Sequence, residues 1–228
     1  MALLLCIDTS TTHASVALVR DEEVLCIKVN QQQKDHASFL QPAIKEIMFE
    51  SKLNLTDVKA IAVTSGPGSY TGLRVGFSSA KGLCYALQIP LIAISTTEVM
   101  SAAALQLINQ LTEKPATFFL CPMIDARRME VFTAVYSSEL KETTANTALI
   151  LDPESFSELL QKSPVYFFGN GADKWKNICP HPNARFIDVL WNAKDMIHPA
   201  NTCFNNSSFT SLAYSVPDYA KDFHTNAK

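Results

Sequence analysis

The sequence predicts an α/β fold built from two similar units in tandem. Apolar runs of strand length alternate with longer segments whose apolar residues recur every three or four positions, as in helices. The order of these segments in the first half largely recurs in the second. Both halves place an aspartate after the first strand (Asp8, Asp125) and a glycine turn after the fourth (Gly66, Gly169). The alternative is that any alternating α/β chain shows such an order.

The first half predicts three strands followed by three helices that alternate with two more strands. The opening run is apolar throughout, as expected of a strand covered on both faces. Pro90 ends the second helix because proline cannot continue it. The predicted strands are Leu3–Ile7, Ser15–Val19, Val24–Val29, Ile61–Val63 and Leu91–Ile94, and the predicted helices start near Phe39, Leu73 and Thr96.

The second half is expected to repeat this plan with shorter helices. The predicted strands are Phe118–Ile124, Met129–Tyr136, Thr147–Leu151, Val165–Phe168 and Phe186–Leu190, with helices at Pro153–Gln161 and around Trp175. The polar run Asn201–Ser211 predicts a loop, and we expect the tail from Val216 to Phe223 to pack back through its aromatic residues. The expected divisions are therefore residues 1–112, 113–200 and a tail of 201–228.

Composition limits the function classes. The chain has 228 residues, a formal net charge of -3 and an isoelectric point near 5.9. Proteins that bind nucleic acid on their own usually carry a basic face, so strong direct binding of nucleic acid by this chain is not expected. No apolar run approaches the roughly 20 residues that span a bilayer. The first residues show no basic leader segment, and the six cysteines are far apart, which favours reduced thiols. We therefore expect a cytoplasmic protein without membrane contact.

Two polar turns are candidates for phosphate chemistry. The first contains Asp8, Thr9 and Ser10 at the end of a buried strand, and the second is the glycine-rich segment Ser65–Gly76 before a helix. Glycines allow close approach of the backbone, and a helix N-terminus can hold an anion. The alternatives are an aspartate turn that satisfies its own backbone and a strand-to-helix turn that needs small residues. The glycine-rich segment matches neither the P-loop nor the dinucleotide fingerprint.

The remaining charged motifs favour structural roles. The five histidines lack the spacing of metal ligands, so we expect no metal site within this chain. His36, just before the first helix, is expected at the surface or in the first helical turn. The segment Asp125–Val131 reads as a turn with surface ion pairs.

Four segments taken in order resemble one family closely. They are Ile7-Asp8-Thr9-Ser10-Thr11, Lys34-Asp35-His36, Gly66-Pro67-Gly68-Ser69-Tyr70-Thr71-Gly72-Leu73-Arg74 and Ile124-Asp125-Ala126-Arg127 with Glu130-Val131. Together they resemble the TsaB family of bacterial tRNA threonylcarbamoyladenosine biosynthesis subunits. The resemblance extends to about Tyr136, and later only Pro217-Asp218-Tyr219 with Lys221-Asp222-Phe223 resembles the family's ending. At Arg128 and Met129 the family often has a glycine.

The resemblance implies an actin-like ATPase fold of two ribonuclease-H-like units, each with a mixed sheet flanked by helices. It implies a non-catalytic scaffold that binds a TsaD-like catalytic subunit for threonylcarbamoyl transfer to the N6 of tRNA adenosine adjacent to the anticodon. A TsaE-like P-loop ATPase joins them, tRNA is reached only through the complex, and the chain alone forms a homodimer. ATP or ADP is expected only in the assembled complex, at Asp8, Thr9, Ser10, Gly66, Pro67 and Gly68.

Two further residue sets follow from the resemblance. TsaD-like enzymes carry a His-x-x-x-His pair that falls here on Thr96 and Met100, which supply no imidazole. The partner interface is expected on the first two helices, at Phe39, Ile44, Ile47, Arg74, Gly76, Phe77, Ala80, Lys81 and Cys84. The competing hypotheses are an active metallopeptidase or kinase of the same fold and a homodimeric module with another regulatory partner.

Overall fold

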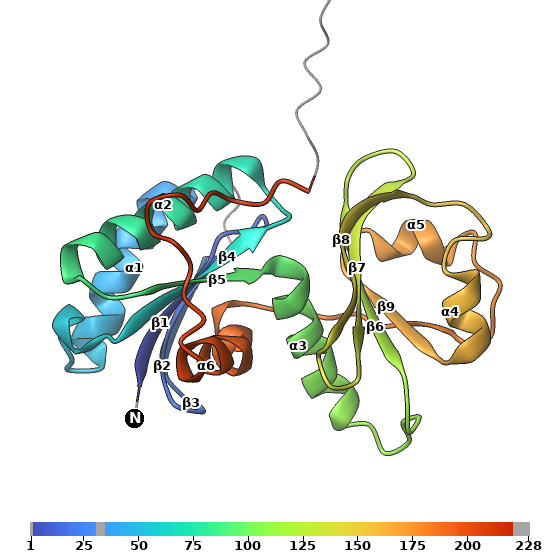
Figure 1. Ribbon diagram of the computed structural model, residues 1–228, viewed down its shortest axis with the longest axis horizontal. Helices are drawn as coiled ribbons and strands as arrows, with labels where there is room; N and C mark the ends of the chain where they lie inside the picture. Colours follow the sequence, from blue (N-terminus) through green and yellow to red (C-terminus); the bar gives the residue numbers. More distant parts are fainter. Residues whose placement is uncertain (1, 31–34, 221–228) are drawn as a thin grey trace, which may run out of the picture. The chain divides into compact units, whose positions relative to one another are not determined.

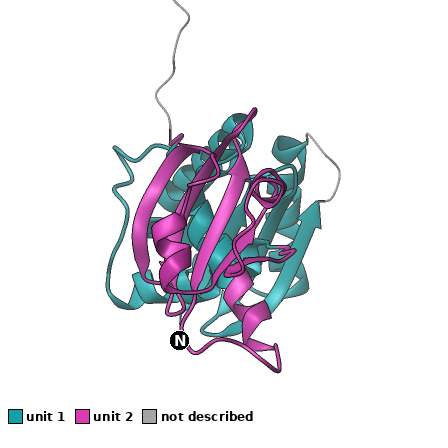
Figure 2. Cartoon of the chain, turned by 90° about the vertical axis from the view of Figure 1, so that its right-hand side faces the viewer, with its two compact units in different colours: residues 1–102, 191–218 teal, residues 103–190, 219–228 magenta. Residues whose placement is uncertain are grey.

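A computed structural model describes residues 2–30 and 35–220. The chain forms two compact units, coloured separately in Figure 2. Unit 1 contains residues 1–102 and 191–218, and unit 2 contains residues 103–190 and 219–228. Each unit holds one five-stranded sheet. Among the described residues, no helix combines the length and the apolar character that a membrane crossing requires.

The sheet of unit 1 is mixed, with the strand order β3-β2-β1-β4-β5 (Figure 1). The pairs β1–β2 and β2–β3 are antiparallel, whereas β1–β4 and β4–β5 are parallel. Its strands are β1 Leu3–Asp8, β2 Ala14–Arg20, β3 Glu23–Asn30, β4 Ala60–Gly66 and β5 Leu91–Ser95. Its helical elements are α1 His36–Glu50, η1 Leu55–Asp57, α2 Tyr70–Leu87, η2 Ala193–Met196 and α6 Ile197–Asn205, and α3 Thr96–Asn109 begins in it.

Helices cover both faces of this sheet, which explains why β1 is apolar throughout. Leu5 and Ile7 belong to the core cluster that includes the buried residues of α1 and α2. Leu4 and Cys6 belong to the opposite cluster, with η2 and α6. Successive side chains of a strand point to opposite faces, so a strand between two helical layers needs apolar residues at every position.

Unit 2 repeats this topology with the strand order β10-β9-β6-β7-β8. The pairs β6–β7 and β7–β8 are antiparallel, and β6–β9 and β9–β10 are parallel. The order matches that of unit 1 strand for strand, which confirms the predicted duplication and the ribonuclease-H-like plan of an actin-like ATPase fold. The elements are β6 Phe119–Asp125, β7 Glu130–Ser137, β8 Glu142–Ile150, α4 Ser157–Lys162, β9 Val165–Phe168, α5 Ala172–Lys176 and β10 Ala184–Phe186.

Four predicted elements differ most from the structure. Strand β8 begins at Glu142, five residues before the predicted Thr147. The expected loop at 201–211 is helical up to Asn205 and irregular beyond it, because Ala200, Cys203 and Phe204 of α6 pack on the unit 1 sheet. The last strand lies at residues 184–186 rather than at 186–190, because residues 184–186 are the ones that pair with β9. Helix α4 begins four residues later than expected, after Phe156, which adopts a left-handed conformation.

The segment that follows α6 packs with unit 1 up to Asp218. We call residues 206–218 the C-terminal strap. Residues 191–218 pack with unit 1, and residues 103–112 pack with unit 2, so the compact units differ from the expected ranges 1–112 and 113–200. The strap is held by its backbone, by Leu212, which packs against the core beside α1 and α2, and by Phe209, whose ring contacts that of Phe204. Phe223 of the expected tail lies outside the described residues.

Candidate functional site

The Asp8 carboxylate at the end of β1 is hydrogen-bonded within its own turn and to β4. Asp8 is 3% exposed, and its Oδ1 accepts hydrogen bonds from the Ser10 amide at 3.0 Å, the Ser10 hydroxyl at 2.7 Å and the Thr64 hydroxyl at 2.9 Å. Burial raises the pKa of Asp8, and these hydrogen bonds oppose the rise. The turn therefore fits the self-satisfying alternative that the sequence left open.

The glycine-rich segment lies against this turn, as the resemblance implied. The Ser69 amide donates to the Ser10 carbonyl at 2.7 Å, which joins the two segments directly. A Cβ atom at Gly66 would overlap the Asp218 carbonyl, and one at Gly68 would overlap the Ser10 carbonyl. Gly66 also has a φ of 118°, which favours glycine. Packing of the chain on itself thus explains these glycines without a ligand.

Two glycines of α2 continue this contact. A Cβ at Gly72 would overlap the Thr9 carbonyl, and a Cβ at Gly76 would overlap the Thr9 Oγ1. Thr9 is fully buried, and its Oγ1 has no hydrogen-bond partner among the described residues. The turn after β1 therefore sits directly on the N-terminal half of α2. Nucleotide binding at Asp8, Thr9, Ser10, Gly66, Pro67 and Gly68 remains a prediction.

His36 is buried, so the expectation of a surface residue is wrong, while its place in the first helical turn is confirmed. It is 9% exposed, and its Nε2 lies 2.8 Å from the Thr11 carbonyl. A carbonyl only accepts, so Nε2 carries the hydrogen. His36 lines a cavity of about 370 Å³ together with hydroxyl-bearing and small residues. The other lining residues are Thr11, Thr12, Ala37, Ser69, Thr71, Gly72 and Val75.

Most residues expected at the partner interface are buried inside unit 1. Ile44, Ile47, Phe77, Ala80 and Cys84 are at most 2% exposed and belong to the core between the sheet and the two helices. The expectation that their side chains contact a partner is therefore wrong in this structure. Their helical spacing reflects the inner faces of α1 and α2, because the apolar stripe of a helix normally faces the core of its own protein.

The other expected interface residues differ among themselves. Phe39 is half-buried against the same core, and Gly76 meets Thr9. Arg74 is exposed, with its guanidinium 3.9 Å from the centre of the Tyr70 ring. Lys81 reaches toward the strap. Of the nine residues expected at the partner interface, only Arg74 and Lys81 thus extend beyond the inner faces of α1 and α2.

The outer face of α1 and α2 carries the features that an interface needs. Phe49 is 85% exposed and Tyr85 is 71% exposed. Ser78, Gly82 and Ala86 form an exposed stripe of small residues at four-residue spacing along α2. A Cβ added at Gly82 would meet no atom of the described residues within 4 Å, so packing inside this chain does not explain this glycine.

The positions corresponding to the imidazole pair lie at the start of α3. Thr96 and Met100 are both fully buried. A buried hydroxyl and a buried thioether do not supply the imidazole ligands of a catalytic iron or zinc ion. Within residues 2–30 and 35–220, no three histidine, cysteine or acidic residues are grouped closely enough to hold a metal ion.

Asp195 is a buried carboxylate that the sequence analysis missed. It is 3% exposed, and its Oδ2 accepts a hydrogen bond from the Asn192 amide at 2.8 Å. Burial raises the pKa of Asp195, and the negative charge of Asp8 adds to the rise. The spacing of Asn192 and Asp195 is that of a capping box, which is the signal that predicts this turn.

The turn after β6 in unit 2 contains an ion pair, as expected, but the partner of Asp125 is Lys174 of α5 and not a residue of the turn. Asp125 ends β6 as Asp8 ends β1, and its Oδ1 lies 2.6 Å from the Lys174 Nζ. This hydrogen bond lowers the pKa of Asp125. Arg127 and Arg128 form the tip of the turn with φ values of 70° and 49°, where a family member with glycine would be relaxed.

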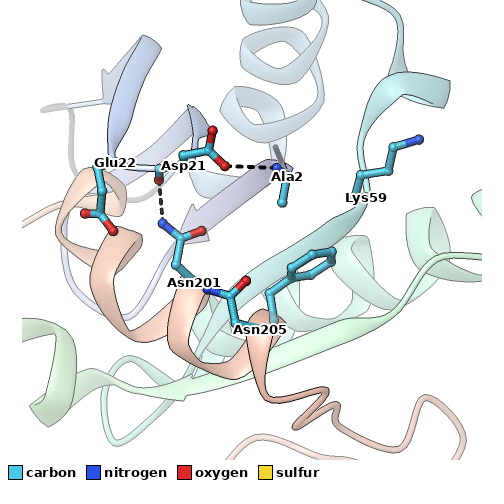
Figure 3. A pocket seen from close by; sticks show the side chains of 7 residues that line it. Ala2, Asp21, Glu22, Lys59, Asn201 and Asn205 are labelled. Carbon is cyan, nitrogen blue, oxygen red and sulfur yellow. Dashed lines mark hydrogen bonds between the residues drawn. The ribbon is translucent and has the colours of Figure 1, made fainter.

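A second polar cavity lies at the amino end of β1 (Figure 3). It measures about 230 Å³ and is lined by the two carboxylates of the β2–β3 turn, Lys59 and the amides of α6. Asp21 accepts a hydrogen bond from the Ala2 amide, and Asn201 donates to the Asp21 carbonyl (Figure 3). These bonds join α6 to the sheet, which is a structural role.

Comparisons with known proteins agree with the resemblance. A family model described as TsaD, tRNA N6-adenosine threonylcarbamoyltransferase, matches residues 23–223. The tRNA threonylcarbamoyladenosine biosynthesis protein TsaB of Escherichia coli is 29% identical, over 96% of this chain and 94% of that protein. TsaB of Bacillus subtilis is also 29% identical, over 77% of this chain and 74% of that protein.

A solved structure shows the same architecture over nearly the whole chain. It is a Pseudomonas aeruginosa protein described as similar to the peptidase YeaZ, with 26% identity, a TM-score of 0.79 and coverage of 97% of this chain and 100% of that one. The duplicated topology, the paired turns around Asp8 and Gly66 and these comparisons agree. The chain therefore belongs to the TsaD family, tRNA N6-adenosine threonylcarbamoyltransferase, and groups within it with the TsaB proteins.

Proposed function

We propose that this chain is a non-catalytic subunit of the machinery that makes tRNA threonylcarbamoyladenosine. It binds a TsaD-like enzyme and supports transfer of threonylcarbamoyl to the N6 of the tRNA adenosine adjacent to the anticodon. The names of its TsaB relatives support the pathway. The outer face of α1 and α2 supports binding of a partner as the task of this chain.

The observation that carries the proposal is that packing within the chain does not explain the glycine at position 82. A glycine in a helix interior costs roughly 0.5–1 kcal/mol relative to alanine. Gly72 and Gly76 on the same helix are explained by packing within the chain, because Thr9 fills the space that a Cβ would need at either position. Gly82 is exposed and has no such reason within the described residues. A partner helix that approaches α2 closely would supply one.

The neighbours of Gly82 fit this interpretation. Small residues one turn away on either side let two helix backbones come close, and exposed aromatic residues beside them provide anchors. Ser78 and Ala86 are the small residues, and Phe49 and Tyr85 are the aromatic ones. The partner surface therefore belongs to unit 1, on the outer faces of α1 and α2 rather than on the inner faces.

Several observations favour a partner role over catalysis by this chain. The positions of the imidazole pair hold Thr96 and Met100. The Asp8 carboxylate is engaged by its own turn, and carbonyl oxygens of the chain lie against Gly66 and Gly68. The transfer chemistry is therefore assigned to the TsaD-like subunit. A TsaE-like ATPase, ATP or ADP and tRNA enter with the assembled complex, and a homodimer uses the same face when the partner is absent.

Reconstitution tests this proposal. The chain is mixed with the TsaD-like and TsaE-like subunits of the same genome, tRNA, ATP and the threonylcarbamoyl donor, and the modified adenosine is measured with and without it. Formation of the modified base should require this chain. Gly82→Arg should abolish binding to the TsaD-like subunit, and Gln106→Arg, at an exposed position of α3, is the matched control.

Two results would reject the proposal. One is full modification without this chain, and the other is turnover by the isolated chain. Binding of the TsaD-like subunit that is unchanged by Gly82→Arg would reject the assigned face.

A further inference from the structure

The C-terminal strap is pinned to unit 1 by its backbone at both ends. The Thr210 amide donates to the Leu91 carbonyl at 2.8 Å, which adds a single bridge to the edge of β5. The Asp218 amide donates to the Ser65 carbonyl at 2.7 Å. Between these points Leu212 packs against the core. The strap therefore has a defined path along unit 1, which Figure 1 shows as the red segment beside α2.

Lys81 joins the middle of the strap to α2. Its Nζ donates to the Ser215 carbonyl at 3.0 Å and to the Ala213 carbonyl at 3.4 Å. Residues four apart on a helix share a face, so Tyr85 lies one turn beyond Lys81 on the same side of α2. Ser78 lies three residues before Lys81 and Gly82 three before Tyr85, so both members of the small-residue stripe neighbour these side chains on the helix surface. The strap thus borders the outer face of α2 where the small-residue stripe runs.

Two large side chains on this pinned segment point away from the chain. Tyr214 is 88% exposed and Val216 is 73% exposed. The residues between and beside them are fixed by the Lys81 and Asp218 hydrogen bonds. An anchored backbone loses little conformational entropy on binding, so exposed aromatic and aliphatic side chains on it are suited to a partner.

We propose that the strap forms the second part of the docking surface for the TsaD-like subunit, with Tyr214 and Val216 as its contacts and Lys81 as the residue that positions it. This inference rests on the proposed function. The occupant follows from continuity: a partner seated on the Gly82 stripe reaches the strap across Lys81 and Tyr85. The strap is then a preformed edge of the interface.

The test measures affinity for the TsaD-like subunit of the same genome by titration calorimetry, using the full chain. Replacing both side chains, Tyr214→Ser with Val216→Ser, should weaken binding about 10- to 100-fold, because two exposed anchors are lost while the backbone path stays. Leu190→Ser is the matched control, since Leu190 is 94% exposed and lies outside the strap. It should leave the affinity unchanged.

Lys81 is tested separately as a positioning residue. Lys81→Met should weaken binding about three- to tenfold and speed hydrogen exchange of residues 209–217, because the strap carbonyls lose their donor. Lys81→Arg should restore both values. A change in affinity without a change in exchange would overturn the positioning role.

The outcomes separate this inference from the proposed function. Unchanged affinity of the doubly substituted strap, with binding lost in Gly82→Arg, overturns the strap inference and leaves the proposed function standing. A loss of self-association alone, with binding of the TsaD-like subunit intact, also overturns it. Absence of any complex between the native chains overturns both.

Discussion

Gly76 and Gly82 lie six residues apart on α2 and should respond oppositely to the same substitution. Gly82→Ala adds a methyl group in open space, so the helix gains about 0.5–1 kcal/mol in free energy of unfolding. Gly76→Ala gains the same helix propensity but drives the new methyl into the Thr9 Oγ1. Overpacking of this kind costs about 1–3 kcal/mol, and Thr9 is fully buried and has little room to retreat.

The expected net effect of Gly76→Ala is a destabilisation of about 0–2 kcal/mol, so the two variants should differ by roughly 1–3 kcal/mol. Urea denaturation followed by circular dichroism and by tryptophan fluorescence measures both. The slope of the free energy against urea should be unchanged, which shows that only stability has moved. Equal stabilisation by both alanines would refute the packing of Thr9 on α2. Destabilisation by Gly82→Ala would show an internal role for Gly82 and remove the main support for the partner face.

Three further predictions concern charge and backbone strain. Asp195→Asn removes a buried carboxylate whose pKa is raised by burial and keeps an acceptor for the Asn192 amide. The folded protein binds the proton more tightly, so the parent loses stability as the pH rises through the raised pKa. The variant should be more stable at pH 7, by on the order of 1 kcal/mol, and urea titrations should show this difference shrinking as the pH falls and vanishing below the unfolded pKa of Asp195. Lys174→Met removes the ion pair that lowers the pKa of Asp125. The ion pair stabilises the folded protein above the unfolded pKa of Asp125, and this contribution is lost as the pH falls through the lowered pKa. The free energy of unfolding at pH 7 should fall by less than about 1 kcal/mol, because the pair is partly exposed, and a larger loss in thermal unfolding would contradict this. Arg128→Gly should raise the stability of unit 2 by up to about 1 kcal/mol, since the turn needs a positive φ, and an unchanged melting temperature would count against strain at the turn.

The positions of both aspartate turns and both glycine turns could be predicted from the sequence. Each follows a short apolar strand, and such strands end where polar and glycine residues begin. Asp8, Gly66, Asp125 and Gly169 accordingly stand at the ends of β1, β4, β6 and β9. Strand order was also accessible, because a meander of three strands followed by alternating helices and strands leaves few arrangements.

The inner and outer faces of α1 and α2 were harder to separate. Periodicity correctly predicts that Ile44 and Phe77 lie on apolar helix faces, but these faces are covered by the unit 1 sheet and not by a partner. Periodicity shows that a face is apolar and not what covers it. The exposed aromatic Phe49 and Tyr85 lie off that stripe, and only the packed sheet shows that they face outward.

The sequence by itself determined the α/β class, the duplicated order of elements, the turns around Asp8 and Gly66 and the family, because these depend on local patterns and on the order of motifs. The tertiary structure decided what each glycine is for, where α6 and the strap pack and which helix faces remain open. Those properties arise from contacts between residues far apart in the chain, such as Gly66 with Asp218 and Lys81 with Ser215. Local composition does not encode such pairings, since the same glycine or lysine suits many surroundings until the fold brings its partner to it.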